Sequence, residues 1–356
     1  MNILILELGG SHSEIIHPLI LLLNYRKAEI HIACNNRLMN LLPEGKSSKN
    51  LLGLPDQFTF KTQLKTFWKI RKYIKVHNIQ TLIIGTTEIN LIRNFSLFIP
   101  SINTIGVIHN AKKLEEKWTS KRIAFNRIKK FLLVSNHLTK EINPIKTYRI
   151  ASLPAIYFPK LNKSVLTKNP NEFWITVPGE VISARRDYLC LFEQMIKSKT
   201  SINIKIVLLG RYNEKEEPQI KTYLDLNDSL RKQVITFENY LSFNDFHSYI
   251  QLSDVILPLV KLSGDTFYSN KRISGSFNLG LAYKIPFLLP ITYTGNIDIN
   301  PYSILYKDYS DLFNRIEAIS KDDMLLKNIK AVYATDEKLD IKFQSNKLYE
   351  FITEKL

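Results

Sequence analysis

The sequence predicts an α/β protein of two Rossmann-like, doubly wound domains that face each other across a cleft. Apolar strand-like runs alternate with helix-like segments, and this alternation stops once, at residues 157–172, before it restarts. The length of 356 residues also suits two ordinary domains. We therefore expect domains at residues 1–160 and 161–356, with the last helix able to pack back on the first domain. A ligand would lie between them, at the carboxyl ends of the strands.

The first half contains an ordered series of strands and helices. Residues 2–8 and 28–34 are short apolar runs suited to buried parallel strands. Residues 14–26 between them predict a helix, in which Pro18 must lie in the first turn or introduce a kink. Further strands are predicted at residues 81–87, 103–110 and 130–136, and a basic helix at residues 61–77.

The second half repeats this pattern after a linker. Residues 157–172 contain several Pro and Asn and few apolar residues, which is typical of a connecting segment. Strands are then predicted at residues 172–179, 203–210, 234–240, 254–260 and 286–292, and helices at residues 186–198 and 243–253. Another helix is expected to follow Ser274-Gly275-Ser276 and to end near Pro286.

Positive charge is concentrated in the first half. Residues 1–160 contain 24 Lys and Arg against 9 Asp and Glu, whereas residues 161–356 contain 25 against 24. No acidic residue occurs from Gln57 to Thr87. The predicted basic helix in this stretch contains interleaved cations and aromatic residues: Lys61, Lys65, Lys69, Arg71, Lys72, Lys75, Phe60, Phe67, Trp68 and Tyr73.

Such a helix suits an anionic membrane surface, with its cations at the headgroups and its rings at the interface. The alternative is a surface helix that packs its aromatic residues in the core and leaves its lysines in water. Nucleic acid is a third candidate partner. We do not expect it, because no DNA- or RNA-binding motif accompanies the charge.

Several classes of protein are excluded by missing motifs. The two cysteines, Cys34 and Cys190, have neither disulfide-framework nor metal-ligand spacing, which indicates a reducing cytoplasm. The amino-terminal residues lack signal-peptide features, and the longest apolar run is too short to cross a bilayer. There is no Walker A loop, GxGxxG, HExxH, CxxC, nucleophile elbow or Asp-x-Asp pair. We expect neither a metal nor a bound cofactor.

A candidate anion site lies in the second half. Lys271 and Arg272 precede the turn Ser274-Gly275-Ser276 and a new helix. Free backbone N–H groups and the helix dipole attract an anion at such a position, and a phosphate suits it best. The alternative is an ordinary helix cap, which also requires a small polar residue.

A second phosphate-binding candidate follows the first strand of that half. The strand ends at Gly179, Glu180 follows, and Arg185-Arg186 stand at the start of the next helix. An arginine there can bind phosphate through two parallel hydrogen bonds, although one of the pair can instead form a salt bridge with a nearby acid. The sequence does not distinguish Arg185 from Arg186.

The first half offers polar residues after two of its strands. Gly10, Ser11 and His12 follow the first strand, where glycine permits close approach of a ligand to the backbone. His109 ends the strand at residues 103–110 and is a candidate general base, or a hydrogen-bonding group for a sugar hydroxyl. A packed or surface histidine is the alternative at both positions.

These segments resemble GT-B glycosyltransferases, most closely the family 4 type that builds bacterial surface polysaccharides. The resemblance is strongest over residues 174–292, through VPGEVISARRD, IKIVLLGRY and KRISGSFNLGLAYKIPFLLP, and it includes VSNHL at residues 134–138. It implies that the second half binds a nucleotide-sugar donor and that the first half binds an acceptor.

The resemblance also implies roles for single residues. Arg185 or Arg186 would contact the donor diphosphate, and His109 would lie at the reaction centre. Arg211 and Tyr212 would flank the nucleotide, and Asn239, Tyr240 and Leu241 would lie near its base. The family's two glutamates around the phosphate-binding turn are missing here, so Ser276 or Asn278 would have to supply their contacts.

Together these features predict a metal-independent, cytoplasmic glycosyltransferase at the inner face of the cell membrane. It would transfer a sugar from a nucleotide diphosphate sugar to a lipid-linked saccharide. Two alternatives remain: a nucleotide-sugar epimerase of the same fold, and a non-catalytic partner protein that binds nucleotide or glycan.

Overall fold

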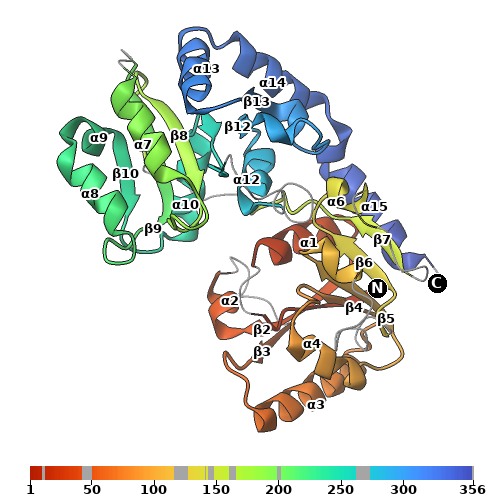
Figure 1. Cartoon of the computed structure of the whole chain (residues 1–356). Coiled ribbons are helices and arrows are strands. Elements are labelled where there is room, and N and C mark those ends of the chain that lie inside the picture. Colours follow the sequence, from red (N-terminus) through yellow and green to blue (C-terminus); the bar gives the residue numbers. More distant parts are fainter. Residues whose placement is uncertain are drawn as a thin grey trace. The chain divides into compact units, whose positions relative to one another are not determined.

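The chain consists of two compact α/β units. Unit 1 comprises Met1–Pro159, Asn270–Ile273 and Glu337–Leu356, and unit 2 comprises Lys160–Ser269 and Ser274–Asp336. The computed structural model describes residues 1–9, 13–41, 50–115, 127–140, 142, 148–159, 166–198, 202–261 and 273–354 (Figure 1).

Unit 1 is built on a parallel sheet of seven strands in the order β3-β2-β1-β4-β5-β6-β7. The strands are β1 (Asn2–Leu6), β2 (Glu29–Asn35), β3 (Leu51–Leu54), β4 (Thr81–Ile84), β5 (Asn103–Ile108), β6 (Lys130–Leu133) and β7 (Arg149–Ser152). The apolar runs of the central strands β1, β4, β5 and β6 are almost entirely buried, as expected for a sheet covered on both faces. The strand order reverses between β1 and β4, which makes this pair the switch point where ligands bind in such sheets.

Helices surround the unit 1 sheet. Those in the first half of the chain are α1 (Ser13–Tyr25), α2 (Asn36–Leu41), α3 (Phe60–Val76), α4 (Asn90–Phe95) and α6 (Asn136–Lys140), with short 3-10 turns η1 (Ser96–Phe98) and η2 (Ala111–Leu114). Leu348, Phe351 and Ile352 of α15 (Ile341–Thr353) join the core of this unit. The last helix therefore belongs to unit 1, although the chain reaches it through unit 2.

A buried lysine anchors the end of α15. Lys130 is 1% exposed, and its ammonium group donates to the carbonyls of Phe351 at 2.9 Å and Ile352 at 3.1 Å. Asn103 donates to the same Ile352 carbonyl at 2.8 Å. These carbonyls have no intrahelical partner at a helix end, so the lysine both satisfies them and complements the helix dipole.

Unit 2 repeats the design with six parallel strands in the order β10-β9-β8-β11-β12-β13. The strands are β8 (Phe173–Pro178), β9 (Ile204–Arg211), β10 (Val234–Phe237), β11 (Val255–Ile256), β12 (Phe287–Pro290) and β13 (Ser303–Tyr306). The helices are α7 (Tyr188–Lys197), α8 (Pro218–Leu226), α9 (Asp228–Gln233), α10 (Phe243–Leu252), α12 (Gly275–Tyr283), α13 (Tyr309–Lys321) and α14 (Met324–Thr335), with 3-10 turns η3 (Ile291–Tyr293) and η4 (Asn300–Tyr302). The next 3-10 turn, η5 (Glu337–Leu339), already belongs to unit 1. Here the order reverses between β8 and β11.

The predicted fold class is confirmed by these two doubly wound sheets, but three strands escape sequence-based prediction. They are β3, β7 and β13, which are four residues each and lie at sheet edges. An edge strand has one neighbour and keeps partly exposed positions, so its apolar run is short and interrupted.

Candidate functional site

The candidate site of unit 2 lies at the carboxyl edge of its sheet, where the loops after β8, β9 and β10 meet the start of α12. Two glycines bring the first two loops together. Gly179 has a φ of +101°, a conformation that favours glycine. A Cβ atom on Gly210 would lie 2.3 Å from the carbonyl oxygen of Gly179. The backbones after β8 and β9 can therefore approach this closely only without side chains.

Arg186 holds this loop from inside. Its guanidinium donates to three carbonyls: Pro178 at 2.6 Å, Glu180 at 2.7 Å and Pro258 at 3.2 Å. Pro258 follows β11, so the arginine ties together the two strands of the switch point. All three nitrogens of this group are thus committed to the fold.

Arg185 has the opposite surroundings. Its side chain is exposed and takes part in no hydrogen bond or ion pair with the described residues. A guanidinium has no acceptor capacity and always carries a charge, so it is available for an anion at this edge. The structure therefore separates the two arginines that the sequence leaves equivalent, and Arg185 is the one free to bind a ligand.

Glu180, Arg211 and Tyr240 form a polar cluster from three successive loops. Arg211 donates to one carboxylate oxygen of Glu180 from Nη2 at 2.9 Å and from Nε at 3.2 Å, and the Tyr240 hydroxyl donates to the same oxygen at 3.2 Å. These hydrogen bonds, that of Arg211 above all, lower the pKa of Glu180. The guanidinium carbon of Arg211 also lies 5.8 Å from the centre of the Tyr240 ring, which is largely exposed.

The Ser-Gly-Ser turn begins α12 beside the same loop. Ser274 is the N-cap and accepts from the backbone N–H of Ser276 at 3.3 Å. The buried Ser276 hydroxyl donates to the carbonyl of Pro178 at 3.3 Å, the group that also accepts from Arg186. A Cβ atom on Gly275 would meet nothing within 4 Å among the described residues. The turn therefore leaves open space at a helix N-terminus, although Ser274 acts as a cap as well.

The other predicted residues of unit 2 differ in what the structure describes. Tyr212 is buried, and burial raises its pKa to about 12, so it packs inside the unit and does not line the edge as predicted. An aromatic ring that follows a central strand is readily taken into the core. Lys271 and Arg272 lie outside the described residues, so their positions stay predictions.

Unit 1 has its own polar edge at its switch point. Glu7, the first residue after β1, is only 1% exposed. Its carboxylate accepts from the backbone N–H of Gly9 at 2.6 Å and from the Thr86 hydroxyl at 2.8 Å. A Cβ atom on Gly85 would lie 2.5 Å from this carboxylate, so any side chain there would displace the carboxylate from its present position. Sequence-based prediction missed Glu7, because an acid after an apolar strand is normally exposed.

His109 stands at the same edge after β5. Its Nε2 lies 3.0 Å from the carbonyl oxygen of Gly85. A carbonyl only accepts, so Nε2 bears the proton and Nδ1 is the basic nitrogen of the neutral ring. Glu88 accepts from the backbone N–H of His109 at 2.8 Å and of Asn110 at 2.6 Å, which fixes the loop. The arrangement suits a general base, with Glu88 as a positioning residue that the sequence did not single out.

The predicted acceptor-binding residues of unit 1 cannot be compared with this network. Gly10, Ser11 and His12 lie outside the described residues. Their neighbour Gly9 is held by Glu7. Gly9 itself follows β1, one of the two strands of the switch point, and the acceptor-binding role of the next three residues stays a prediction.

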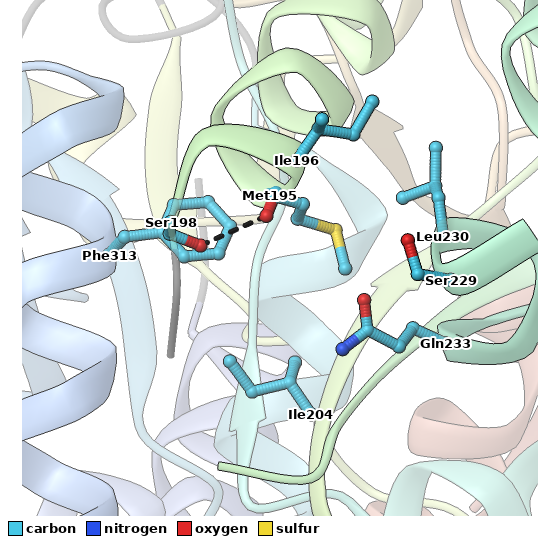
Figure 2. A pocket seen from close by; sticks show the side chains of 8 residues that line it. All are labelled: Met195, Ile196, Ser198, Ile204, Ser229, Leu230, Gln233 and Phe313. Carbon is cyan, nitrogen blue, oxygen red and sulfur yellow. Dashed lines mark hydrogen bonds between the residues drawn. The ribbon is translucent and has the colours of Figure 1, made fainter. Parts of the chain in front are cut away.

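Two further features of the described residues bear on the site. Within the residues that the structure describes, no three His, Cys, Asp or Glu side chains are grouped to hold a metal ion, and no helix is long and apolar enough to cross a membrane. Figure 2 shows a pocket lined by the ends of α7 and α9, by Phe313 and by Ile204, the first residue of β9. It therefore lies at the amino edge of the sheet, away from the candidate site, and the described residues that line it carry no titratable group.

The two sheets and their switch points define the GT-B fold. Similarity to solved structures supports this assignment over the whole chain. A glycosyltransferase of Rickettsia africae has 15% sequence identity and a TM-score of 0.67, with 100% of this chain and 99% of that one covered. HepE of Anabaena, solved with UDP and glucose, has 13% identity and a TM-score of 0.66, with 99% of each chain covered.

A further similar structure has a different activity. The UDP-GlcNAc 2-epimerase of Methanocaldococcus jannaschii has 14% identity and a TM-score of 0.59, with 89% of this chain and 92% of that one covered. The sequence matches no family model and no curated protein. At these identities the similarity establishes the fold, and function must be argued from the site.

Proposed function

We propose that this chain is a glycosyltransferase that takes a sugar from a nucleotide diphosphate sugar. The observation that supports this most directly is the edge of unit 2, where the uncommitted Arg185 and the open N-terminus of α12 adjoin one loop. A diphosphate suits both groups, because a guanidinium binds phosphate oxygens bidentately and a helix N-terminus offers free N–H groups. HepE, which shares the fold, binds UDP and glucose.

The cluster of Glu180, Arg211 and Tyr240 would hold the nucleoside beside that diphosphate. The exposed Tyr240 ring offers a stacking surface for a base, and the ionised Glu180 accepts hydrogen bonds from hydroxyl groups. Glu180 is thus a candidate to replace a carboxylate contact that the α12 segment lacks. Lys271 and Arg272 would add charge near the diphosphate.

The chemistry would use charge stabilisation without a metal. Negative charge that develops on the leaving diphosphate would be met by Arg185 and the dipole of α12, which are held in place before reaction. In unit 1, Nδ1 of His109 would accept the proton of the attacking hydroxyl. Glu7 would support this edge by fixing Gly9 beside β1. The residues Gly10, Ser11 and His12 would then contact the acceptor.

The acceptor would be a lipid-linked saccharide at the inner face of the cell membrane, as in enzymes of the family 4 type that build bacterial surface glycans. The support is the net positive charge, which falls almost entirely in residues 1–160. A membrane-bound substrate with anionic phosphates explains this one-sided charge through long-range attraction.

A screen of nucleoside diphosphates by thermal unfolding in EDTA tests the proposal. A ligand that binds only the folded state raises its stability, so one nucleotide should raise the melting temperature without any metal. Absence of a shift with every nucleotide would contradict the donor site. A shift that appears only after a divalent cation is added would contradict metal independence.

A nucleotide-sugar epimerase is the second candidate, because a UDP-GlcNAc 2-epimerase shares the fold. It requires no lipid or acceptor. Incubation of the protein with each nucleotide sugar alone distinguishes the two: an epimerised free nucleotide sugar indicates the epimerase. Nucleotide binding without turnover on any acceptor would instead indicate a non-catalytic partner protein.

A further inference from the structure

Helix α3 of unit 1 has two distinct faces. Thr66, Phe67, Ile70 and Ile74 are buried on one face, where the Phe67 ring lies 5.3 Å from that of Phe95. This contact accounts for only one of the helix's aromatic residues. Tyr73 also packs against this core, and its hydroxyl lies 3.0 Å from Nδ1 of the buried His31. The four interleaved aromatics are therefore divided, because Phe67 and Tyr73 anchor the helix whereas Phe60 and Trp68 remain exposed.

The outer face exposes large apolar side chains in a stripe. Phe60, Leu64 and Trp68 are 78%, 38% and 60% exposed, and their spacing of four residues places them along one side of the helix. The Trp68 ring lies 5.7 Å from that of Phe98 in η1, whose neighbour Leu97 is 62% exposed. The stripe thus extends beyond α3 onto η1, and α3 runs along the outside of unit 1 (Figure 1).

Uncompensated cations surround the stripe. Lys61, Lys65, Lys72 and Lys75 are exposed, and their ammonium groups form no hydrogen bond or ion pair with the described residues. The other two cations of the helix are used locally, since Lys69 donates to the Gly53 carbonyl at 3.0 Å and Arg71 to the Phe98 carbonyl at 2.9 Å. No acid occurs between residues 57 and 87 to neutralise them.

These features together fit a lipid surface better than water or nucleic acid. Exposure of adjacent aromatic and aliphatic side chains to water is energetically unfavourable, so a purely solvated face does not explain them. Aromatic rings can stack on bases, but Leu64 and Leu97 cannot. At a bilayer interface, rings and aliphatic groups enter the headgroup region while lysines contact anionic lipids.

From this combination we propose that the outer face of α3, with Leu97, is the surface that docks on an anionic lipid bilayer. The inference deepens the peripheral membrane association of the proposed function and rests on it. Phe60, Leu64 and Trp68 enter the interface, and Lys61, Lys65 and Lys72 supply the electrostatic attraction.

Co-sedimentation of the full-length protein with vesicles tests this docking. Phosphatidylcholine vesicles are compared with and without phosphatidylglycerol, at low and physiological ionic strength. We expect binding only when the anionic lipid is present. The variant K61Q/K65Q/K72Q should lose roughly a hundredfold in affinity. The matched control K215Q/K232Q/K330Q removes equal charge from exposed positions of unit 2 and should bind within about twofold of the wild type, because these lysines lie outside the docking surface.

The contribution of the apolar stripe to vesicle binding can be measured separately. The measurement uses a Trp118→Phe background, because Trp118 lies outside the described residues. In that background the fluorescence of Trp68 should be quenched by brominated lipid, and the added Trp68→Phe change should remove the quenching, because Trp174 is buried. L64A/L97A should weaken vesicle binding at least about tenfold, whereas Leu226→Ala, at an exposed site of unit 2, should not. Unchanged melting temperatures exclude unfolding as the cause.

Three results would overturn the docking surface. They are equal binding of the two lysine triple variants, absence of Trp68 quenching, and lysine-dependent binding of single-stranded RNA by a protein that ignores vesicles. The nucleoside diphosphate shift of unit 2 is measured in the same variants. If the nucleoside diphosphate no longer raises the melting temperature but vesicle binding is intact, only the proposed donor site is contradicted. If the nucleotide shift is intact but vesicles are not bound, only the docking surface is contradicted.

Discussion

Arg185 and Arg186 are adjacent in the chain, but their surroundings assign them different tasks. Arg186 gives its hydrogen bonds to three backbone carbonyls and joins the loop after β8 to Pro258, beyond the end of β11. Arg185 is exposed and has no hydrogen-bond or ion-pair partner among the described residues. A charged group whose donors are already satisfied gains little from a phosphate, whereas an unsatisfied one gains a charge-assisted hydrogen bond.

Arg185→Ala should therefore weaken nucleoside diphosphate binding by about 10- to 100-fold, with the melting temperature unchanged. Arg186→Ala should instead lower the free energy of unfolding by about 2–3 kcal/mol, because the carbonyls of Glu180 and Pro258 lose the donors that Arg186 supplies. Calorimetric titration and urea unfolding of both variants measure the two effects. Reversed phenotypes would show that Arg186 is the phosphate ligand.

His17 on α1 determines part of the acid stability. Burial lowers its pKa from 6.5 to about 4 in the native state. Between these values the unfolded chain binds more protons, so the free energy of unfolding should fall as the pH drops from about 6.5 to about 4, by about 3 kcal/mol at most. Urea unfolding across this range should show a smaller pH dependence for His17→Gln. An unchanged slope would contradict the assignment.

At the scale of elements, the loop after β8 depends on close backbone approach. Gly179 adopts positive φ, and Gly210 of β9 lies against its carbonyl group. The N-terminus of α12 is attached to the same loop through Ser276. Gly275 differs from both, because no described residue lies within 4 Å of the place where its Cβ atom would be. The site therefore combines two glycines that packing requires with one that leaves room for a ligand.

Gly210→Ala and Gly275→Ala form a matched pair. The new methyl group at Gly210 meets backbone at 2.3 Å, so this variant should lose about 2 kcal/mol or more of stability. At Gly275 alanine should be neutral or stabilising by about 0.5–1 kcal/mol, since it reduces the freedom of the unfolded chain. It should nevertheless weaken nucleotide binding, which calorimetry detects. Unaltered affinity would indicate that the nucleotide does not bind beside the N-terminus of α12.

At the scale of the whole molecule, the stability of unit 1 depends on the C-terminal helix α15, which the chain reaches only after unit 2. Leu348, Phe351 and Ile352 complete the core of unit 1, and Lys130 and Asn103 bind the carbonyls at the end of α15. Residues more than 200 positions apart thus share one core. Unit 1 cannot complete its core until the last helix is made, whereas unit 2 closes its sheet with earlier residues.

Leu348→Ala should destabilise unit 1 by about 2–5 kcal/mol through a cavity in this core. Nucleoside diphosphate should still raise the stability of unit 2 to the same extent. Thermal unfolding with and without the nucleotide separates the two contributions. A variant that also loses the nucleotide shift would show that the two units do not unfold independently.

The central strands were predictable because they are fully buried and leave continuous apolar runs, as at residues 2–8 and 203–210. The edge strands β3, β7 and β13 were not, since half-exposed segments of four residues leave no such run. The arginine pair and the Ser-Gly-Ser turn were recognisable at the ends of strands. The burial of Tyr212 and the role of Glu7 depend on neighbours far along the chain and were missed.

The sequence by itself determined the two α/β halves, the basic first half and the short list of candidate anion-binding residues, since these depend on local pattern and composition. The tertiary structure alone decided which arginine is free, which rings of α3 face outward and where the last helix packs. These properties arise from contacts between residues distant in the chain. The physical reason is that a side chain's availability depends on whether the fold supplies partners for its polar groups and cover for its apolar surface.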